Sequence, residues 1–222
     1  MSAGMEITMK QTDIINPFQP YMTLEMDGYS QINRTDYGIS HFYEFTIHDE
    51  KKHCIKAVPD ASIDLLFNIG ENKVSTYISG TVFGVKKWEL GTQDDCFGVR
   101  FQPGQGILPK DITMEMIVND DIEIDGDIFG KNLTEKIALA KTMSERIDIF
   151  KKAYEDIVLG RSSLSDKEKI NEYLVNRISR TKGMITMRQL EDETNYSACY
   201  LRRIFKSFHG ISPKQFAQYI RF

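Results

Sequence analysis

The 222-residue sequence predicts an α+β protein with an N-terminal β-barrel, a helical connector and a C-terminal bundle of helices. Three observations lead to this prediction. Short strand-like runs without a helical pattern between them occupy residues 37–102, apolar residues then recur at helical spacing, and a series of helix-start signals follows from Ser165 onward. We therefore divide the chain into residues 1–160 and residues 161–222.

Alternation of apolar and polar residues marks the first clear strand. In the run YEFTIH, Tyr43, Phe45 and Ile47 alternate with polar side chains, which is the pattern of a half-buried strand. Further strand-like runs follow, bounded by turn signals such as Pro59-Asp60 and Pro103-Gly104: ASIDLLFNIG, KVSTYISG, TVFGVKKWEL and CFGVRFQ. Several short strands in succession are typical of a barrel or a jelly roll.

A long stripe of apolar residues at steps of three and four follows the strands. It predicts one long amphipathic helix. The stripe either forms a dimer seam or packs on the barrel, and we favour packing. Its members are Leu133, Ile137, Ala140, Met143, Ile147, Phe150, Tyr154 and Ile157.

The charge of the chain is divided unevenly. With 41% hydrophobic and 27% charged residues, the composition is that of an ordinary globular protein. From Arg161 to Phe222, 12 Lys and Arg stand against 6 Asp and Glu, a net charge of +6, whereas the preceding residues carry 16 against 26, a net charge of −10. A basic end on an acidic body suits a protein that meets phosphate with one domain, although surface charge also serves solubility alone.

The cysteines and the N-terminus indicate the cellular compartment. Cys54, Cys96 and Cys199 lie far apart and form no CxxC pair, which argues against a disulfide framework or a thiolate zinc site. The start of the chain lacks a basic segment followed by an apolar run, and no apolar stretch is long enough to span a membrane. We expect a cytoplasmic protein with no membrane partner.

Catalytic and metal-binding interpretations have little support. His41, His48 and His53 could suggest a metal in a barrel, but His41 and His48 fall on opposite faces of a regular strand. The run DIEIDGD from Asp121 opens like a calcium loop, yet Asn132 occupies the position of the bidentate Glu, so we predict a solvated acidic turn. Phosphate loops and nucleophile motifs are missing. We expect no enzyme activity, no metal and no cofactor.

The C-terminal residues carry a dense set of helix-capping signals. A Ser or Thr followed three residues later by Glu or Gln is a capping box, while Asn or Gly in the left-handed conformation ends a helix. The signals predict four helices, the second very short, with Ile211 packing on Phe216 as a hydrophobic staple. They are Ser165 with Glu168, Lys182-Gly183, Thr186 with Gln189, Asn195, Ser197, Gly210, and Ser212 with Pro213 and Gln215.

The third predicted helix has two contrasting faces. Leu201, Ile204, Phe205 and Phe208 form an apolar stripe. Two helices joined by a three- to four-residue turn, the second with a cationic face, form the arrangement that places a recognition helix in the major groove of DNA. The alternative is a small helical bundle whose arginines only solvate a surface. The opposite face carries Cys199, Arg202, Arg203 and Lys206.

These residues also carry a family resemblance. Ser197-x-x-x-Leu201-x-x-x-Phe205, Gly210-x-Ser212-Pro213, Phe216 and Arg221 resemble the first helix-turn-helix and linker helix of AraC-family transcriptional regulators. PDASIDLLFNIG and GVRFQPG are similar to the cupin-like sensor domain of one branch of that family. The resemblance implies a barrel that binds a small effector or a partner and often dimerises. It also implies DNA contacts at Ser197, Cys199, Arg202 and Arg203, with Lys206 nearer the DNA backbone.

The sequence departs from the family pattern in two ways. Glu191 stands where a small residue is usual and Asn195 where the turn glycine is usual, and the acidic run Glu191-Asp192-Glu193 opposes the attraction to phosphate. The chain also stops where the family continues with a second helix-turn-helix. We expect either a truncated sequence, which we favour, or a protein that uses one motif per chain and binds as a dimer.

Together these features predict an effector-responsive regulator that binds double-stranded DNA. The expected partners are DNA, a small-molecule effector and a second copy of the chain. A sensor or interaction module without productive DNA binding is the alternative, and a metal-dependent cupin-type enzyme is a third interpretation.

Overall fold

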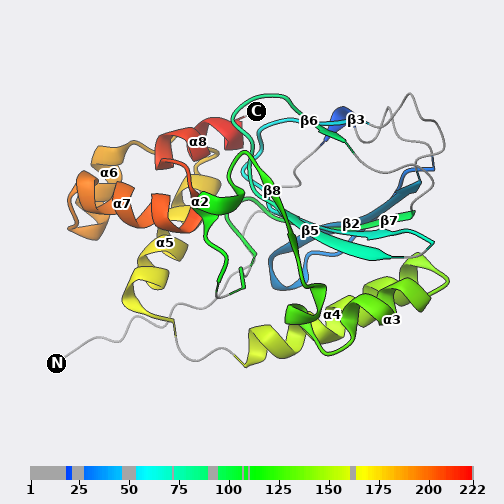
Figure 1. Cartoon of the computed structure of the whole chain (residues 1–222). Coiled ribbons are helices and arrows are strands. Elements are labelled where there is room, and N and C mark those ends of the chain that lie inside the picture. The colour runs from blue at the N-terminus through cyan, green and yellow to red at the C-terminus, as the bar shows by residue number, and fades with distance from the viewer. Residues whose placement is uncertain are drawn as a thin grey trace.

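The computed structural model describes residues 19–21, 28–46, 54–71, 73–89, 95–106, 108–109, 111–160 and 164–221. Within these residues the chain is an α+β protein with eight strands and seven α-helices. The strands are gathered in the N-terminal part, and four helices form the C-terminal part beside them (Figure 1). The α+β fold class predicted from the sequence is therefore confirmed.

The main sheet has six strands in the order β1-β2-β7-β4-β5-β8, and every neighbouring pair is antiparallel. Each of the five predicted strand-like runs contains a strand, and four of these strands belong to the main sheet, although this sheet is open. β1 and β8 lie at its two edges and do not pair with each other, so the predicted barrel is not closed among the described residues. Period-2 alternation is the same in an open sheet and a barrel, which is why the sequence could not distinguish them. The strands are β1 (Ser30–Asn33), β2 (Ile39–Thr46), β4 (Asp64–Ile69), β5 (Val74–Ser79), β7 (Asp95–Phe101) and β8 (Asp121–Ile124).

A separate ribbon pairs β3 (Cys54–Ala57) with β6 (Lys86–Glu89). In Figure 1 it lies on the opposite side of the sheet from helices α3 (Leu133–Leu139) and α4 (Met143–Leu159). The sheet is thus covered on both faces. This two-sided cover explains why β2 is almost entirely buried rather than half-buried.

The alternation predicted for β2 buried one face of the strand, but aromatic side chains are buried on both faces. Phe42 faces α4 and the main core, whereas Tyr43 and Phe45 are buried on the other face. The Tyr43 ring lies against Gly98 of β7, where an added Cβ would stand 2.0 Å from a ring atom. Only glycine leaves room for this ring, so the packing of one large side chain decides the residue on the neighbouring strand.

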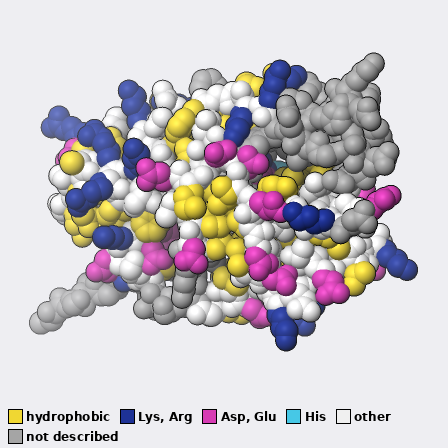
Figure 2. Space-filling view, in the orientation of Figure 1, with side chains coloured by type: hydrophobic (Ala, Val, Ile, Leu, Met, Phe, Trp, Pro, Cys, Tyr) yellow, Lys and Arg dark blue, Asp and Glu magenta, His cyan; other side chains and the backbone are white. Residues whose placement is uncertain are grey.

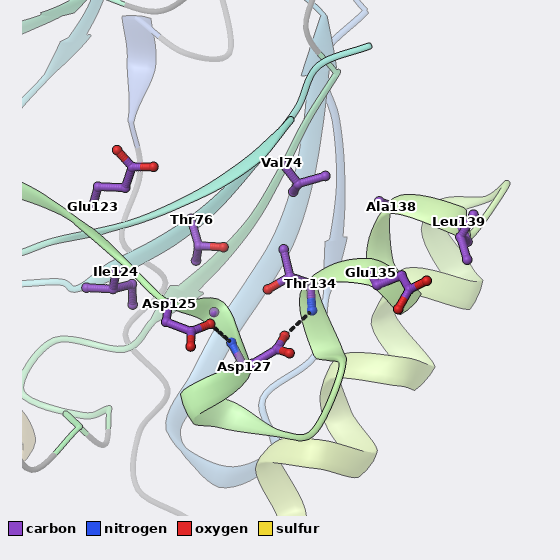
Figure 3. Close-up of a pocket in the computed structure, with 11 residues that line it drawn as sticks. Val74, Thr76, Glu123, Ile124, Asp125, Asp127, Thr134, Glu135, Ala138 and Leu139 are labelled. Atoms are coloured by element: carbon purple, nitrogen blue, oxygen red, sulfur yellow. Dashed lines mark hydrogen bonds between the residues drawn. The ribbon is translucent and has the colours of Figure 1, made fainter. Parts of the chain in front are cut away.

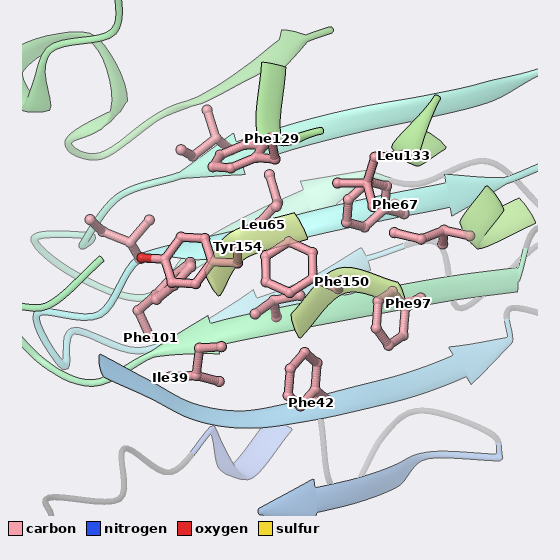
Figure 4. Packing of buried hydrophobic residues seen from close by; sticks show 14 of the residues in the cluster. Ile39, Phe42, Leu65, Phe67, Phe97, Phe101, Phe129, Leu133, Phe150 and Tyr154 are labelled. Atoms are coloured by element: carbon pink, nitrogen blue, oxygen red, sulfur yellow. The ribbon is translucent and has the colours of Figure 1, made fainter. Parts of the chain in front are cut away.

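The predicted long helix is two helices. The chain leaves helical geometry at Ala140, and Thr142 begins α4 with a capping box in which its side chain accepts from the backbone of Glu145. The apolar stripe continues across the break because both helices pack on the same face of the sheet. Figure 4 shows the Phe150 ring in the middle of this core. The centroids of the Phe150 and Phe42 rings are 6.0 Å apart. The expectation that the stripe packs on the sheet domain is confirmed.

The acidic run from Asp121 was predicted as a turn, but its first four residues form strand β8. Pairing with β5 satisfies the backbone, and the edge position leaves acidic side chains access to water. The turn begins only at Asp125, whose side chain accepts from the backbone N–H of Asp127 at 2.9 Å and begins a short 3-10 helix, Gly126–Phe129.

The C-terminal helices begin and end as the capping signals predicted. Capping boxes open α5 (Asp166–Arg180) and α6 (Met187–Thr194), Ser197 caps α7 (Ala198–His209), and Ser212 with Gln215 opens α8 (Pro213–Arg221). A second hydrophobic core joins the four helices: Leu174, Val175, Ile178, Leu190, Leu201, Phe205, Ile211, Phe216 and Ala217.

The helical part is docked on the sheet part. Ala61 precedes β4 and packs in the helical core, although it adopts a left-handed φ of 62° that is unusual for alanine. Gly210, at the end of α7, contacts Val118, which follows helix α2 (Met114–Ile117). These contacts fix α7 against the end of the sheet domain, as Figure 1 shows for α2 and α7.

Candidate functional site

The turn between α6 and α7 consists of three residues, 195–197. Asn195 ends α6 in the left-handed conformation with φ 59°, as predicted from its side chain type. The Ser197 hydroxyl accepts a hydrogen bond from the backbone N–H of Tyr200 at 3.4 Å. Ser197 was predicted to contact DNA, and in this structure its hydroxyl is used as the N-cap of α7.

The other predicted contact residues share one exposed face of α7. Cys199, Arg202, Arg203 and Lys206 are all exposed, and the helix buries its other side in the helical core. Figure 2 shows Lys and Arg side chains gathered at the end of the molecule that α6 and α7 form. The face is open to a large partner, because the contacts between α7 and the sheet domain lie at its C-terminal end.

The acidic run of α6 is mostly engaged in local structure. The Glu191 carboxylate accepts from the backbone N–H of Ala198 at 2.6 Å, which places a negative charge at the N-terminus of α7. Glu193 accepts from Arg177 Nε at 2.7 Å and from the Tyr173 hydroxyl at 2.8 Å, and the hydrogen bond from Arg177 is the main cause that lowers the pKa of Glu193 to about 2. Of the three acids, Asp192 is the one whose exposed side chain makes no such contact among the described residues.

Two tyrosines, one in the turn before α7 and one in its first turn, were not singled out from the sequence. The rings of Tyr196 and Tyr200 lie 5.1 Å apart, and the guanidinium carbon of Arg203 stands 5.4 Å from the Tyr200 ring centroid. The contact between Tyr200 and Arg203 could have been predicted from the sequence, because residues three apart lie on the same face of a helix.

The C-terminal end of α7 is anchored by a histidine. His209 is buried beside the rings of Phe205 and Phe216 and hydrogen-bonds Asn171 of α5 at 2.8 Å. Burial lowers the pKa of His209 to about 3, so the side chain is neutral near pH 7. A neutral, packed histidine holds α7 without adding to the charge of the exposed face.

The sheet domain contains a buried charge network around Arg100. Its guanidinium hydrogen-bonds the carboxylates of Asp60 and Asp64, and the Tyr43 hydroxyl donates to Asp64 at 3.2 Å. Burial alone would lower the pKa of Arg100, but the two carboxylates raise it above its usual value. Arg100 thus lies on the sheet face opposite α4, a point that strand alternation left open, while Val99 and Phe101 belong to the core. The network borders Ala61, the residue that enters the helical core.

A pocket of about 480 Å³ opens between the β8 edge of the sheet and α3 (Figure 3). Thr76 supplies a buried hydroxyl for which the described residues offer no hydrogen-bond partner. In Figure 3 this oxygen points toward Thr134. Carboxylates and apolar side chains share the remaining walls, so the pocket can hold a small polar or cationic molecule. These wall residues include Glu123, Asp125, Glu135, Ala138 and Leu139.

The histidines considered for a metal are not brought together in the described part of the chain. His41 is buried and its ring nitrogen hydrogen-bonds Ser40 at 3.0 Å, while burial lowers its pKa to about 3. His48 and His53 lie outside the described residues. Over the ranges that are described, no group of three or more His, Cys, Asp or Glu side chains could hold a metal ion.

Comparison with known families gives one match. Residues 37–123 match a family described as "Domain of unknown function (DUF6597)". No curated protein and no solved structure matches the chain.

The matched residues, 37–123, run from just before β2 into β8 and include the Arg100 network. Helices α3 to α8 lie beyond them, so the match says nothing of the exposed α7 face. Among the described helices, none combines the length and the apolar character needed to cross a membrane.

Proposed function

We propose that this protein is a transcriptional regulator of the AraC type that binds double-stranded DNA through α7 and responds to a small effector bound by its cupin-like N-terminal domain. Residues 161–222 are its DNA-binding domain, and α6, the turn 195–197 and α7 are its helix-turn-helix. The protein acts in the cytoplasm.

One observation carries the proposal. Helix α7 presents Cys199, Arg202, Arg203 and Lys206 on a single exposed face while both of its ends are fixed. Arginine pairs with guanine edges in the major groove, lysine neutralises phosphates, and a rigid helix presents both at a defined spacing. A surface that served solubility alone would not require a short turn and capped helices at both sides.

The effector part of the proposal is supported by the sheet domain. The pocket beside Thr76 has the size of a small-molecule site, and residues 118–120, the segment after α2, lead directly into its strand β8. That segment includes Val118, which touches Gly210 at the end of α7. A ligand that shifts β8 would therefore act on the position of the proposed recognition helix.

One motif supplies few phosphate contacts, so we propose that two chains bind together. Their recognition helices would read half-sites about 34 Å apart, one turn of the double helix. Dimerisation also raises the effective concentration of the second motif once the first is bound.

The test is selection of bound sequences from a random duplex pool by the 222-residue protein at near-physiological salt. We expect an enriched motif, in the form of a spaced repeat, with affinity that falls steeply as salt rises. The matched control is the Arg202→Ala/Arg203→Ala double variant, which should enrich nothing. A folded protein that enriches no motif contradicts the proposal and favours an interaction module instead.

A further inference from the structure

The side chains of Tyr196, Tyr200 and Arg203 form a ladder along one flank of α7. The two rings are tilted by 35° at a centroid distance of 5.1 Å, and Arg203 stands over the second ring at 5.4 Å. Tyr196 belongs to the turn and is 43% exposed, so the ladder runs from the turn onto the helix.

The position of Tyr200 on the helix is informative. At 100° per residue it lies between the buried stripe and the exposed face, on the side of Arg203 rather than of Arg202. Its side chain is accordingly neither buried nor exposed. A half-buried ring on this flank can act as a rigid platform for the arginine beside it.

The two neighbouring arginines therefore differ. Arg203 lies over an aromatic face, whereas the described residues show no ring contact for Arg202. A free arginine side chain loses considerable rotamer freedom when it docks on a base, and a stacked guanidinium has already lost part of it. Stacking thus holds Arg203 ready for bidentate pairing with a guanine edge, whereas the Arg202 side chain keeps its rotamer freedom.

We propose that Tyr200 is a positioning residue that holds Arg203 for base reading, with Tyr196 supporting the Tyr200 ring. The inference rests on the proposed function, because it concerns how α7 distinguishes DNA sequences. It assigns the sharp base preference of the protein to Arg203 rather than to Arg202.

The test uses the motif obtained by selection and compares its affinity with that of each single-base variant. One variant protein carries Phe at position 200, and further variants carry phenylalanines with an increasing number of fluorine atoms. Fluorination weakens the cation–π contact with Arg203 while it keeps the shape of the ring. We expect the Tyr200→Phe protein to keep the preference at the base pair read by Arg203. Along the fluorinated series that preference should fall by about 2- to 5-fold, while preferences at other base pairs stay unchanged.

A double-variant cycle provides the control. In an Arg203→Ala background, the fluorinated residues should cause no further change in the base preference. In an Arg202→Ala background, they should lower the preference as they do in the parent protein. A flat series, or an equal loss at every base pair, would overturn the inference while the selected motif still supports DNA binding. If no motif is selected at all, the proposed function itself fails.

Discussion

The carboxylate of Glu191 on α6 accepts a hydrogen bond from the backbone N–H of Ala198, the first residue of α7, at 2.6 Å. This contact crosses the turn and ties the end of one helix to the start of the next. It gives Glu191 a structural role, because an anion at a helix N-terminus is stabilising. The acidic run would therefore oppose the proposed binding to DNA phosphates less than its formal charge indicates.

Glu191→Ala should lower the free energy of unfolding by about 0.5–2 kcal/mol, since the first turn of α7 loses an acceptor and a favourable charge. Asp192→Ala is the matched control and should be nearly neutral, because this side chain is exposed. Urea denaturation of both variants measures the difference. Equal stability of the two would show that the Glu191 contact contributes nothing.

Stability should decrease as the pH falls below 6.5, in part through His209. The unfolded side chain binds a proton near pH 6.5, whereas the folded one stays neutral until about pH 3. Between about pH 6.5 and pH 3, proton uptake by the unfolded His209 therefore lowers the free energy of unfolding by about 1.4 kcal/mol for each unit by which the pH falls. His209→Gln should reduce that slope when unfolding is measured from pH 7 to pH 4. Identical pH profiles of the parent and the variant would count against a buried neutral His209.

Arg100→Met should destabilise the protein by about 3–5 kcal/mol, because the partly buried carboxylates of Asp60 and Asp64 would lose the buried guanidinium that pairs with both of them. Replacing all three residues, as Arg100→Met/Asp60→Asn/Asp64→Asn, should recover much of the loss. Chemical denaturation of both variants reports the comparison. A triple variant as unstable as the single one would mean that the arginine acts by packing rather than by charge pairing.

Gly210→Ala should cost at least about 1–2 kcal/mol, since φ is +67° and an added Cβ would stand 2.1 Å from Val118. Gly84→Ala serves as the control, because its φ is ordinary and a Cβ there meets nothing within 4 Å. Thermal unfolding of the two variants should separate them clearly. A tolerated alanine at position 210 would contradict the close contact between α7 and the segment after α2.

Arg203→Ala should weaken binding to the selected DNA by about 1–3 kcal/mol and relax the preference at one base pair. Lys206→Ala should weaken binding to all sequences alike and reduce the slope of log affinity against log salt by about 1. Titrations at several salt concentrations on matched and mismatched duplexes distinguish the two. A uniform loss for Arg203→Ala would remove its assignment as a base-reading residue.

Much of the helical part could be predicted because its signals are local. A capping box joins residues three apart, and the left-handed ends at Asn195 and Gly210 depend on a single side chain. The exposed face of α7 follows in the same way from the periodicity of one helix. These features need no knowledge of the rest of the chain, which is why the residues predicted to share that face do share it.

Features that join distant residues could not be predicted. The six strands alternate as they would in a barrel, and only their pairing order leaves β1 and β8 as edges. The break before Thr142 is hidden because two helices continue one apolar stripe across the same sheet. Phe42 and Tyr43 are both buried because each face of the sheet has its own cover.

Local sequence signals were enough to establish where the C-terminal helices begin and end and which side of α7 is cationic. Tertiary structure alone decided that Arg100 pairs with Asp60 and Asp64, and that the carboxylate of Glu191 reaches α7. The physical reason is the range of the interactions. Capping and helical periodicity act within a few residues, whereas charge pairing, sheet order and domain docking depend on which distant segments the folded chain brings into contact.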